Sequence, residues 1–105
     1  MKFTPDEVAA AQRTVYAAMP PTPQYAWPLL QQRLGFKTWV KHENHTPAGA
    51  FKVRGGLTYF DQLQRSGAKV SGVISATRGN HGQSVGFAAR QQGVPATIVV
   101  PYGNS

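Results

Sequence analysis

The sequence contains no cysteine, which excludes a disulfide framework and a thiolate metal site. Acidic residues are scarce, with 4 Asp plus Glu against 11 Lys plus Arg and a formal net charge of +7. Such an excess suits nucleic acid or an anionic ligand. The basic residues stand singly along the chain, however, and form no run interleaved with aromatic residues. We therefore expect no nucleic-acid partner.

Long apolar runs and two common phosphate-binding motifs are also missing. No window reaches the roughly 18 apolar residues that a membrane-spanning helix needs, and the N-terminus has no apolar signal-peptide core. We therefore expect a cytoplasmic protein without a membrane partner. The patterns G-x-x-x-x-G-K-S/T and G-x-G-x-x-G do not occur, which excludes a P-loop and a dinucleotide fingerprint. His42 and His45 are three residues apart, not four, and lie in a predicted turn, so we expect no metal site.

The composition is that of a folded chain, with 41% hydrophobic and 14% charged residues over 105 positions. The segment Thr4-Pro5-Asp6-Glu7 is a capping box, and it predicts a helix that ends before Pro20-Pro21. The residues expected on its buried face are Val8, Ala11, Val15 and Met19. Residues 36–41 alternate with a period of two and predict a strand. Residues 22–28 are expected to be irregular, and 29–34 fit either a helix or extended chain.

A second helical pattern begins at Ala50. Val53, Leu57 and Phe60 share one face with Leu63 at its edge, and Ser66-Gly67 is a stop signal. Lys52 therefore lies in the first turn of a helix. Residues 70–76 and 96–100 are apolar, β-branched runs that flank a predicted helix over 80–92. This βαβ order predicts the α/β class, with a parallel sheet in a three-layer arrangement.

The segment Thr77-Arg78-Gly79-Asn80-His81-Gly82-Gln83 joins the end of a predicted parallel strand to the start of a helix. Open α/β sheets bind ligands at this position, and unpaired N–H groups at a helix N-terminus favour an anion such as a carboxylate. Asn80 fits two roles on spacing alone, either as the cap of the helix or as a donor to a ligand.

Two motifs carry a resemblance to a known family. They are K-x-E-N-x-T-P-A-G-A-F-K-V-R-G-G at residues 41–56 and T-R-G-N-H-G-Q at 77–83. Together they resemble the fold-type II pyridoxal-phosphate enzymes, the tryptophan synthase β-like family, and within it the threonine/serine dehydratases. The resemblance implies an incomplete N-terminal portion of a two-domain enzyme. Residues 1–48 would be an N-terminal helix and strand of the larger domain, and 49–105 the first part of the smaller βαβ domain.

The resemblance also assigns residues to the cofactor and the substrate. Lys52 matches the lysine that forms a Schiff base with pyridoxal 5'-phosphate and shuttles the substrate's Cα proton. Asn80 matches the residue that hydrogen-bonds the cofactor's ring hydroxyl. A lysine amine that forms a Schiff base needs its charged form disfavoured. We expect burial beside Phe51 and the cation of Arg54 to disfavour the charged form of Lys52. The loop expected to receive the substrate carboxylate consists of Thr77, Arg78, Gly79, Asn80 and His81.

Arg78 departs from the family pattern, because many relatives have a small residue there. Its guanidinium would either contact a second anion or point to solvent. The resemblance implies β-elimination of a hydroxy amino acid, such as threonine or serine, to a 2-oxo acid and ammonia. Alternatives are a pyridoxal-phosphate racemase or β-replacement enzyme, and a small α/β binding module without catalysis. The family's phosphate loop and its partner for the pyridine nitrogen lie outside the sequence, so we expect these residues alone to be inactive and a longer enzyme to be a homo-oligomer.

Overall fold

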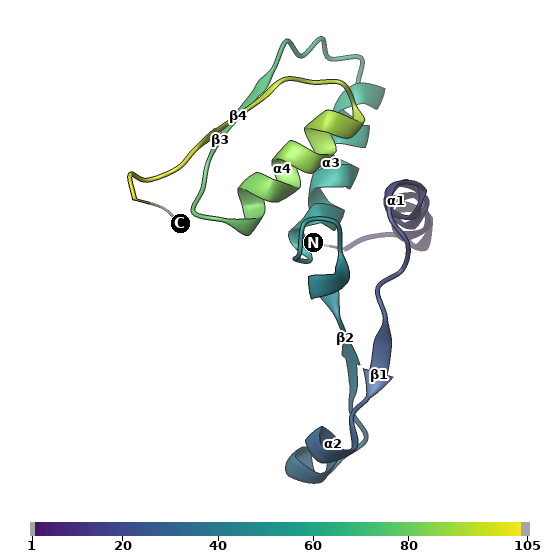
Figure 1. Cartoon of the computed structure of the whole chain (residues 1–105). Coiled ribbons are helices and arrows are strands. Elements are labelled where there is room, and N and C mark those ends of the chain that lie inside the picture. The colour runs from purple at the N-terminus through teal and green to yellow at the C-terminus, as the bar shows by residue number, and fades with distance from the viewer. Residues whose placement is uncertain (1, 104–105) are drawn as a thin grey trace.

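The computed structural model describes residues 2–103 and has mixed α/β structure, as Figure 1 shows. Its first half contains α1 (Pro5–Ala18), β1 (Gln24–Ala26), α2 (Pro28–Leu34), β2 (Trp39–Lys41) and the 3-10 helix η1 (Glu43–His45). Its second half contains α3 (Lys52–Arg65), β3 (Val73–Ala76), α4 (Asn80–Gln91) and β4 (Ala96–Val99). The class predicted from the sequence is confirmed.

The predicted βαβ unit is present in the second half. Strands β3 and β4 pair in parallel, with Val73 opposite Ala96 and Ala76 opposite Val99. The connecting helix α4 ends before Gly93, whose φ of 66° is readily adopted by glycine. Strand β3 is shorter than predicted, because it begins at Val73 and not at residue 70.

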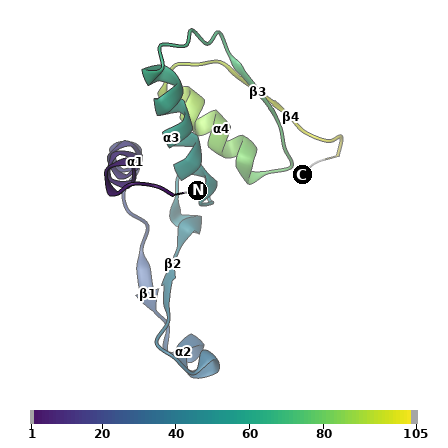
Figure 2. The ribbon, with the colours of Figure 1, turned by 180° about the vertical axis from the view of Figure 1, so that it is seen from behind.

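Helix α4 packs on one side against β3 and β4 and on the other against α3, which in turn contacts α1. Figures 1 and 2 show both helices on the same side of the strands. Among residues 2–103 the two-stranded sheet is therefore covered on one face only, so this range contains part of the predicted three-layer domain.

The core lies between the helices. The buried face of α3 consists of Val53, Leu57 and Phe60, which confirms the helical pattern read from the sequence. The other members of the core cluster are Val15, Met19, Ala48, Ala88 and Ala89. Val8 was expected to be buried on α1, but 58% of it is exposed. It lines an open groove between α1 and α3.

The capping box at the start of α1 is confirmed. The Glu7 backbone N–H donates to Thr4 Oγ1 at 3.2 Å, and the Thr4 backbone N–H donates to Glu7 Oε2 at 2.7 Å. The hydrogen bond from the Thr4 backbone lowers the pKa of Glu7. Both ends of the box thus satisfy N–H groups that the helix itself leaves unpaired.

Strands β1 and β2 with α2 form an arm, residues 24–41, that extends away from the helices in Figures 1 and 2. The two strands are antiparallel, with Gln24 opposite Lys41. The strand predicted over 36–41 is correct only for its last three residues. Gly35 ends α2 in the left-handed region with a φ of 77°. Residues 36–38 then connect α2 to β2.

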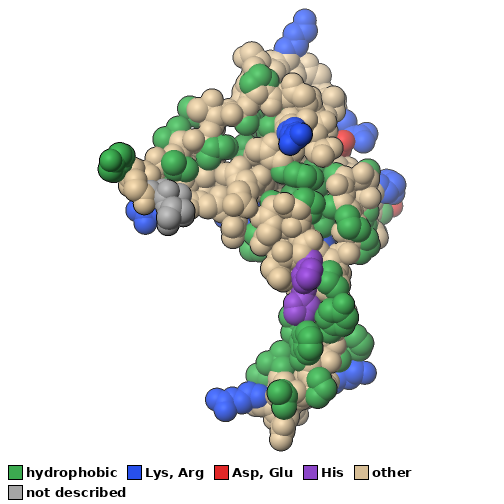
Figure 3. All heavy atoms as spheres, viewed as in Figure 1, with side chains coloured by type: hydrophobic (Ala, Val, Ile, Leu, Met, Phe, Trp, Pro, Cys, Tyr) green, Lys and Arg blue, Asp and Glu red, His purple; other side chains and the backbone are tan. Residues whose placement is uncertain are grey.

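Hydrophobic side chains cover much of the arm in Figure 3, next to the histidines. Trp27 and Trp39 are 46% and 54% exposed. Trp27 Nε1 donates to His42 Nε2 at 2.9 Å, and the His42 ring lies edge to face with the Trp27 ring and with the His45 ring. In this structure the two histidines therefore belong to an aromatic cluster at the base of the arm.

Candidate active site

Lys52 is the first residue of α3, as predicted. The residue before the helix, Phe51, makes no side-chain cap, so the turn is held by other contacts. Thr46 Oγ1 donates to the Ala50 carbonyl at 2.8 Å and accepts from the Ala50 N–H at 2.9 Å. Gly49 lies between these two residues with a φ of 64°, a conformation that favours glycine. These contacts fix the chain immediately before the lysine.

A further hydrogen bond joins Lys52 to α4. Ser84 Oγ donates to the Lys52 carbonyl at 2.6 Å, and Ser84 is only 1% exposed. Gly56 allows this approach, because a Cβ added there would lie 2.5 Å from Ser84 Oγ. Gly56 thus serves the packing of α3 against α4.

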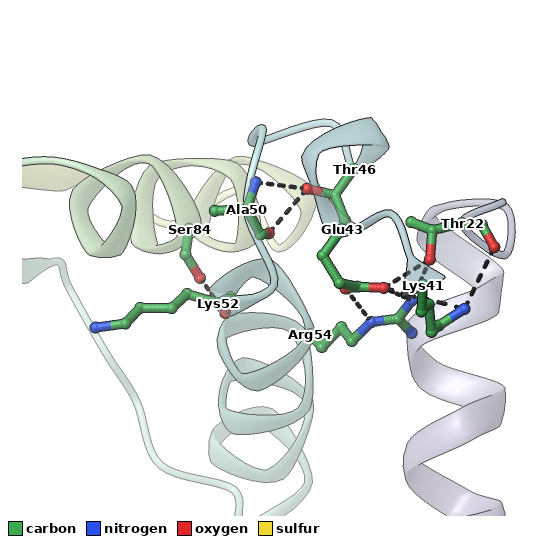
Figure 4. A network of polar contacts seen from close by, with 8 residues as sticks. All are labelled: Thr22, Lys41, Glu43, Thr46, Ala50, Lys52, Arg54 and Ser84. Carbon is green, nitrogen blue, oxygen red and sulfur yellow. Dashed lines mark hydrogen bonds and ion pairs between the residues drawn. The ribbon is translucent and has the colours of Figure 1, made fainter. Parts of the chain in front are cut away.

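The expected environment of the Lys52 amine is wrong in two respects. Phe51 is 63% exposed and Lys52 is itself exposed, so the aromatic ring does not bury the amine within the described chain. Arg54 is committed elsewhere, because its Nε donates to Glu43 Oε2 at 2.7 Å. Figure 4 shows the Lys52 and Arg54 side chains extending in opposite directions from α3.

Glu43 is the centre of a polar cluster that sequence reasoning missed. A second hydrogen bond from Arg54 reaches Glu43 Oε1 at 2.9 Å, and Thr22 Oγ1 donates to the same oxygen at 2.6 Å. The hydrogen bonds from Arg54 lower the pKa of Glu43 from 4.5 to about 2, against an opposing effect of burial. The same contact raises the pKa of Arg54, whose guanidinium also lies over the Tyr16 ring. The cluster connects α1 and the segment after it with η1 and α3.

The loop at residues 77–81 lies between β3 and α4, as predicted. The Thr77 N–H donates to the Val99 carbonyl at 2.9 Å, and Thr77 Oγ1 accepts from the Gly79 N–H at 3.2 Å. The helix cap is Gly79, not Asn80, and it makes no side-chain cap bond. The capping role that the sequence left open for Asn80 is therefore wrong, since Asn80 is the first residue of the helix.

The start of α4 presents backbone donors. Within residues 2–103, no acceptor is found for the N–H groups of Asn80 and His81, as expected for the first turn of a helix. Gly82 lets this turn approach the sheet, because a Cβ there would lie 2.5 Å from Thr77 Cγ2 and 2.8 Å from Ile98 Cγ2. The N-terminus of α4 is thus held against the ends of β3 and β4, and its donors favour an anion.

A cleft of about 800 Å³ lies between α3, β3 and the start of α4. It brings together three of the predicted site residues, Phe51, Lys52 and His81. The remaining predicted residues (Thr77, Arg78, Gly79 and Asn80) do not line it, although they are the immediate neighbours of His81. Lys52 therefore lies at one edge of the cleft, and the loop reaches the cleft through His81.

The cleft has further lining residues that sequence reasoning missed. Tyr59 and Gly55 follow Lys52 at seven and three residues on α3, so helical spacing would have found them. Val73 and Ser75 lie on the half-buried side of β3. They are two residues apart, so the alternation of side chains along a strand places them on the same face. The apolar lining includes Phe60, Ile74 and Val85.

The cleft has the size for pyridoxal phosphate and some of the groups that would hold it. Its volume falls within the range of small-molecule sites, about 300 to 1,000 Å³. Lys52 offers an amine for an aldehyde, Tyr59 and the apolar residues offer walls for a flat ring, and the start of α4 offers N–H groups for an anion.

Among residues 2–103, no group of three His, Asp or Glu side chains could hold a metal ion. No helix in this range is long and apolar enough to cross a membrane.

Comparison with known proteins agrees with this geometry. The family described as "Pyridoxal-phosphate dependent enzyme" matches residues 15–105. The biosynthetic L-threonine dehydratase of Haemophilus influenzae is 39% identical over 87 residues, which are 83% of this chain and 17% of that protein.

Solved structures share the fold. A pyridoxal 5'-phosphate-dependent aspartate racemase superposes with a TM-score of 0.85 at 27% identity, covering 100% of this chain and 34% of its own. The T.th. threonine deaminase gives a TM-score of 0.77 at 33% identity, covering 92% of this chain and 33% of its own. The chain thus spans about a third or less of the proteins it matches, and it belongs to the family of pyridoxal-phosphate-dependent enzymes.

Proposed function

We propose that the protein is a pyridoxal-phosphate-dependent ammonia-lyase that converts a hydroxy amino acid, such as threonine or serine, to a 2-oxo acid and ammonia. The observation that carries the proposal is the shared cleft, where Lys52 at the start of α3 faces the same space as His81 at the start of α4. The similarity to a threonine dehydratase and a threonine deaminase supports this substrate class. Family membership favours an enzyme over the alternative of a binding module.

In this proposal Lys52 would hold the cofactor covalently through Nζ, as a Schiff base. When bound, pyridoxal phosphate supplies an electron sink for the charge left at Cα after deprotonation. Lys52 Nζ would take the proton from the substrate's Cα. The β-hydroxyl would leave with a proton as water, and hydrolysis of the resulting enamine would consume one water, so that the hydroxy amino acid gives a 2-oxo acid and ammonia overall. Lys52 lines the cleft and is exposed, and its side chain makes no ion pair among residues 2–103, so Nζ is accessible from the cleft.

The loop of Thr77, Arg78, Gly79, Asn80 and His81 would receive the substrate carboxylate. The unpaired N–H groups of Asn80 and His81 support this role, because they lie at the positive end of the α4 dipole. Asn80 would in addition bond the cofactor's ring hydroxyl, and Phe51 would contact the cofactor from the edge of the cleft. Two roles stay open for Arg78: its guanidinium would either contact a second anion or point to solvent.

A racemase is the second candidate, because the whole chain superposes on the aspartate racemase. Both reactions begin with removal of the Cα proton and need the same lysine. They differ in the next step, which is loss of a β-substituent in one and return of a proton in the other.

Several expectations from the sequence stay predictions. They are the division into residues 1–48 and 49–105, the homo-oligomer, the cytoplasmic location, and the lack of nucleic-acid and membrane partners.

The test uses the natural polypeptide that carries this sequence, with pyridoxal phosphate added. We expect 2-oxobutanoate from L-threonine, and loss of product in Lys52→Ala. Lys69→Ala is the matched control, because Lys69 is an exposed lysine in the turn after α3 and should be dispensable. Gly79→Asp should raise the KM for the amino acid by placing a carboxylate at the anion loop. Formation of D-serine from L-serine without 2-oxo acid would replace the ammonia-lyase by the racemase.

A further inference from the structure

One buried hydroxyl connects the two sides of the cleft. Ser84 lies in the second turn of α4, the helix whose first turn begins with Asn80 and His81. Its Oγ donates to the Lys52 carbonyl at 2.6 Å, as Figure 4 shows. The residue that carries the amine is therefore bonded directly to the helix that presents the anion-binding N–H groups.

The contact is close and leaves Ser84 no alternative partner in solvent. Ser84 is 1% exposed, and a Cβ at Gly56 would lie 2.5 Å from Ser84 Oγ and 3.0 Å from the Ser84 carbonyl. A carbonyl oxygen has two lone pairs, so the Lys52 oxygen can accept from Ser84 and from the N–H four residues along its own helix. The hydroxyl thus adds a donor without disturbing the α3 ladder.

The first turn of α3 needs such a contact. Phe51 precedes the helix without a side-chain cap, and uncapped ends leave their first N–H groups unpaired and fray readily. Thr46 holds Ala50, which lies before the turn. Ser84 does not pair these N–H groups, but its bond to the Lys52 carbonyl ties the first residue of the helix to α4.

We propose that Ser84 is a positioning residue, which fixes the main chain of Lys52 against α4 so that Nζ is held at the cleft opposite the anion loop. The proposal rests on the proposed function, because it gives Lys52 the role of cofactor-binding amine. Misplacement of a reacting group by 1 Å can cost about 100-fold in rate, so a bond that sets the origin of a long side chain has a measurable effect.

The experiment compares Ser84→Ala with Ser66→Ala. Ser66 is a matched control, because its Oγ also donates to a backbone carbonyl at 2.6 Å, that of Leu63, but at the far end of α3. The natural polypeptide that carries this sequence is incubated with pyridoxal phosphate and reduced with borohydride, and the label on Lys52 is divided by the label on Lys69. We expect the ratio to fall about three- to ten-fold in Ser84→Ala, in line with loss of one buried hydrogen bond, and to stay unchanged in Ser66→Ala.

Amide hydrogen exchange over residues 52–56 gives a readout without cofactor. It should accelerate in Ser84→Ala and not in Ser66→Ala. A wild-type label ratio in folded Ser84→Ala would overturn the positioning role while leaving Lys52 as the cofactor amine. If the wild-type protein carried no more label on Lys52 than on Lys69, this result would instead overturn the proposed function. Should Ser84→Ala not fold by circular dichroism, Ser84→Cys, a similar shape with a weak donor, replaces it, and a wild-type ratio there overturns the positioning role.

Discussion

The ion pair of Glu43 with Arg54 makes stability depend on pH in a window that can be calculated. The pKa of Glu43 is lowered from 4.5 to about 2. Because the folded value is the lower one, the stabilisation is complete above the unfolded value of 4.5 and is lost as the pH falls through about 2. The difference between the two values corresponds to about 3 kcal/mol.

Solvent reduces this figure, because the Glu43 and Arg54 side chains are 22% and 26% exposed. We expect about 2 kcal/mol from the pair at neutral pH. The Glu43→Gln variant cannot ionise, so it should lack this contribution at pH 6 and should approach the wild type at pH 2. Urea unfolding followed by circular dichroism at several values between pH 6 and pH 2 measures the difference.

Glu7→Gln is the control for general acid effects, since the pKa of Glu7 is also lowered but by hydrogen bonds at an exposed helix start. The stability difference between the wild type and Glu43→Gln should shrink as the pH falls. If both proteins lose the same free energy of unfolding between pH 6 and pH 2, the ion pair does not stabilise the chain and the reasoning is refuted.

Three glycine substitutions near the site and one substitution of the α1 cap can be tested through the free energy of unfolding. Gly56→Ala should destabilise the chain by about 1–3 kcal/mol, because its Cβ would meet Ser84; its neighbour Gly55→Ala has open space and should stabilise the helix by about 0.5–1 kcal/mol. Equal effects at these two positions would contradict the close contact of the helices. Gly82→Ala should also destabilise by about 1–3 kcal/mol, since the first turn of α4 has no room for a methyl group, and a neutral result would show that this turn can move. Thr4→Ala should cost about 1 kcal/mol by removing the cap of α1, and no loss would mean that this helix contributes nothing to unfolding.

Local signals predicted the elements that depend on local physics. The capping box of α1, the glycine stop after α4 and the buried face of α3 each follow from residues within one or two turns, and the structure confirms all three. The parallel pairing of β3 and β4 was also predictable, because a strand, helix and strand in this order leave few arrangements.

Features set by distant partners were not predictable from one sequence. Strand β2 is limited to the three residues that pair with β1, and the pairing of Arg54 with Glu43 spans eleven positions. The hydrogen bond from Ser84 to Lys52 spans thirty-two. Periodicity reports the face of an element and not the residue that meets it, so it did not predict the ion pair of Arg54 with Glu43.

These distant contacts share one consequence at the start of α3. Glu43 holds Arg54 in the first turn, Thr46 holds the residues just before it, and Ser84 holds the carbonyl of Lys52. The contacts of Thr46 and Ser84 reach main-chain atoms and that of Glu43 reaches the Arg54 side chain, whereas the Lys52 side chain is exposed and extends away from the ion pair. A functional group is effective when the residues around it hold it in place. The contacts from η1, from Thr46 and from α4 hold the start of a helix that has no side-chain cap, and this supports the proposal that Lys52 holds a cofactor.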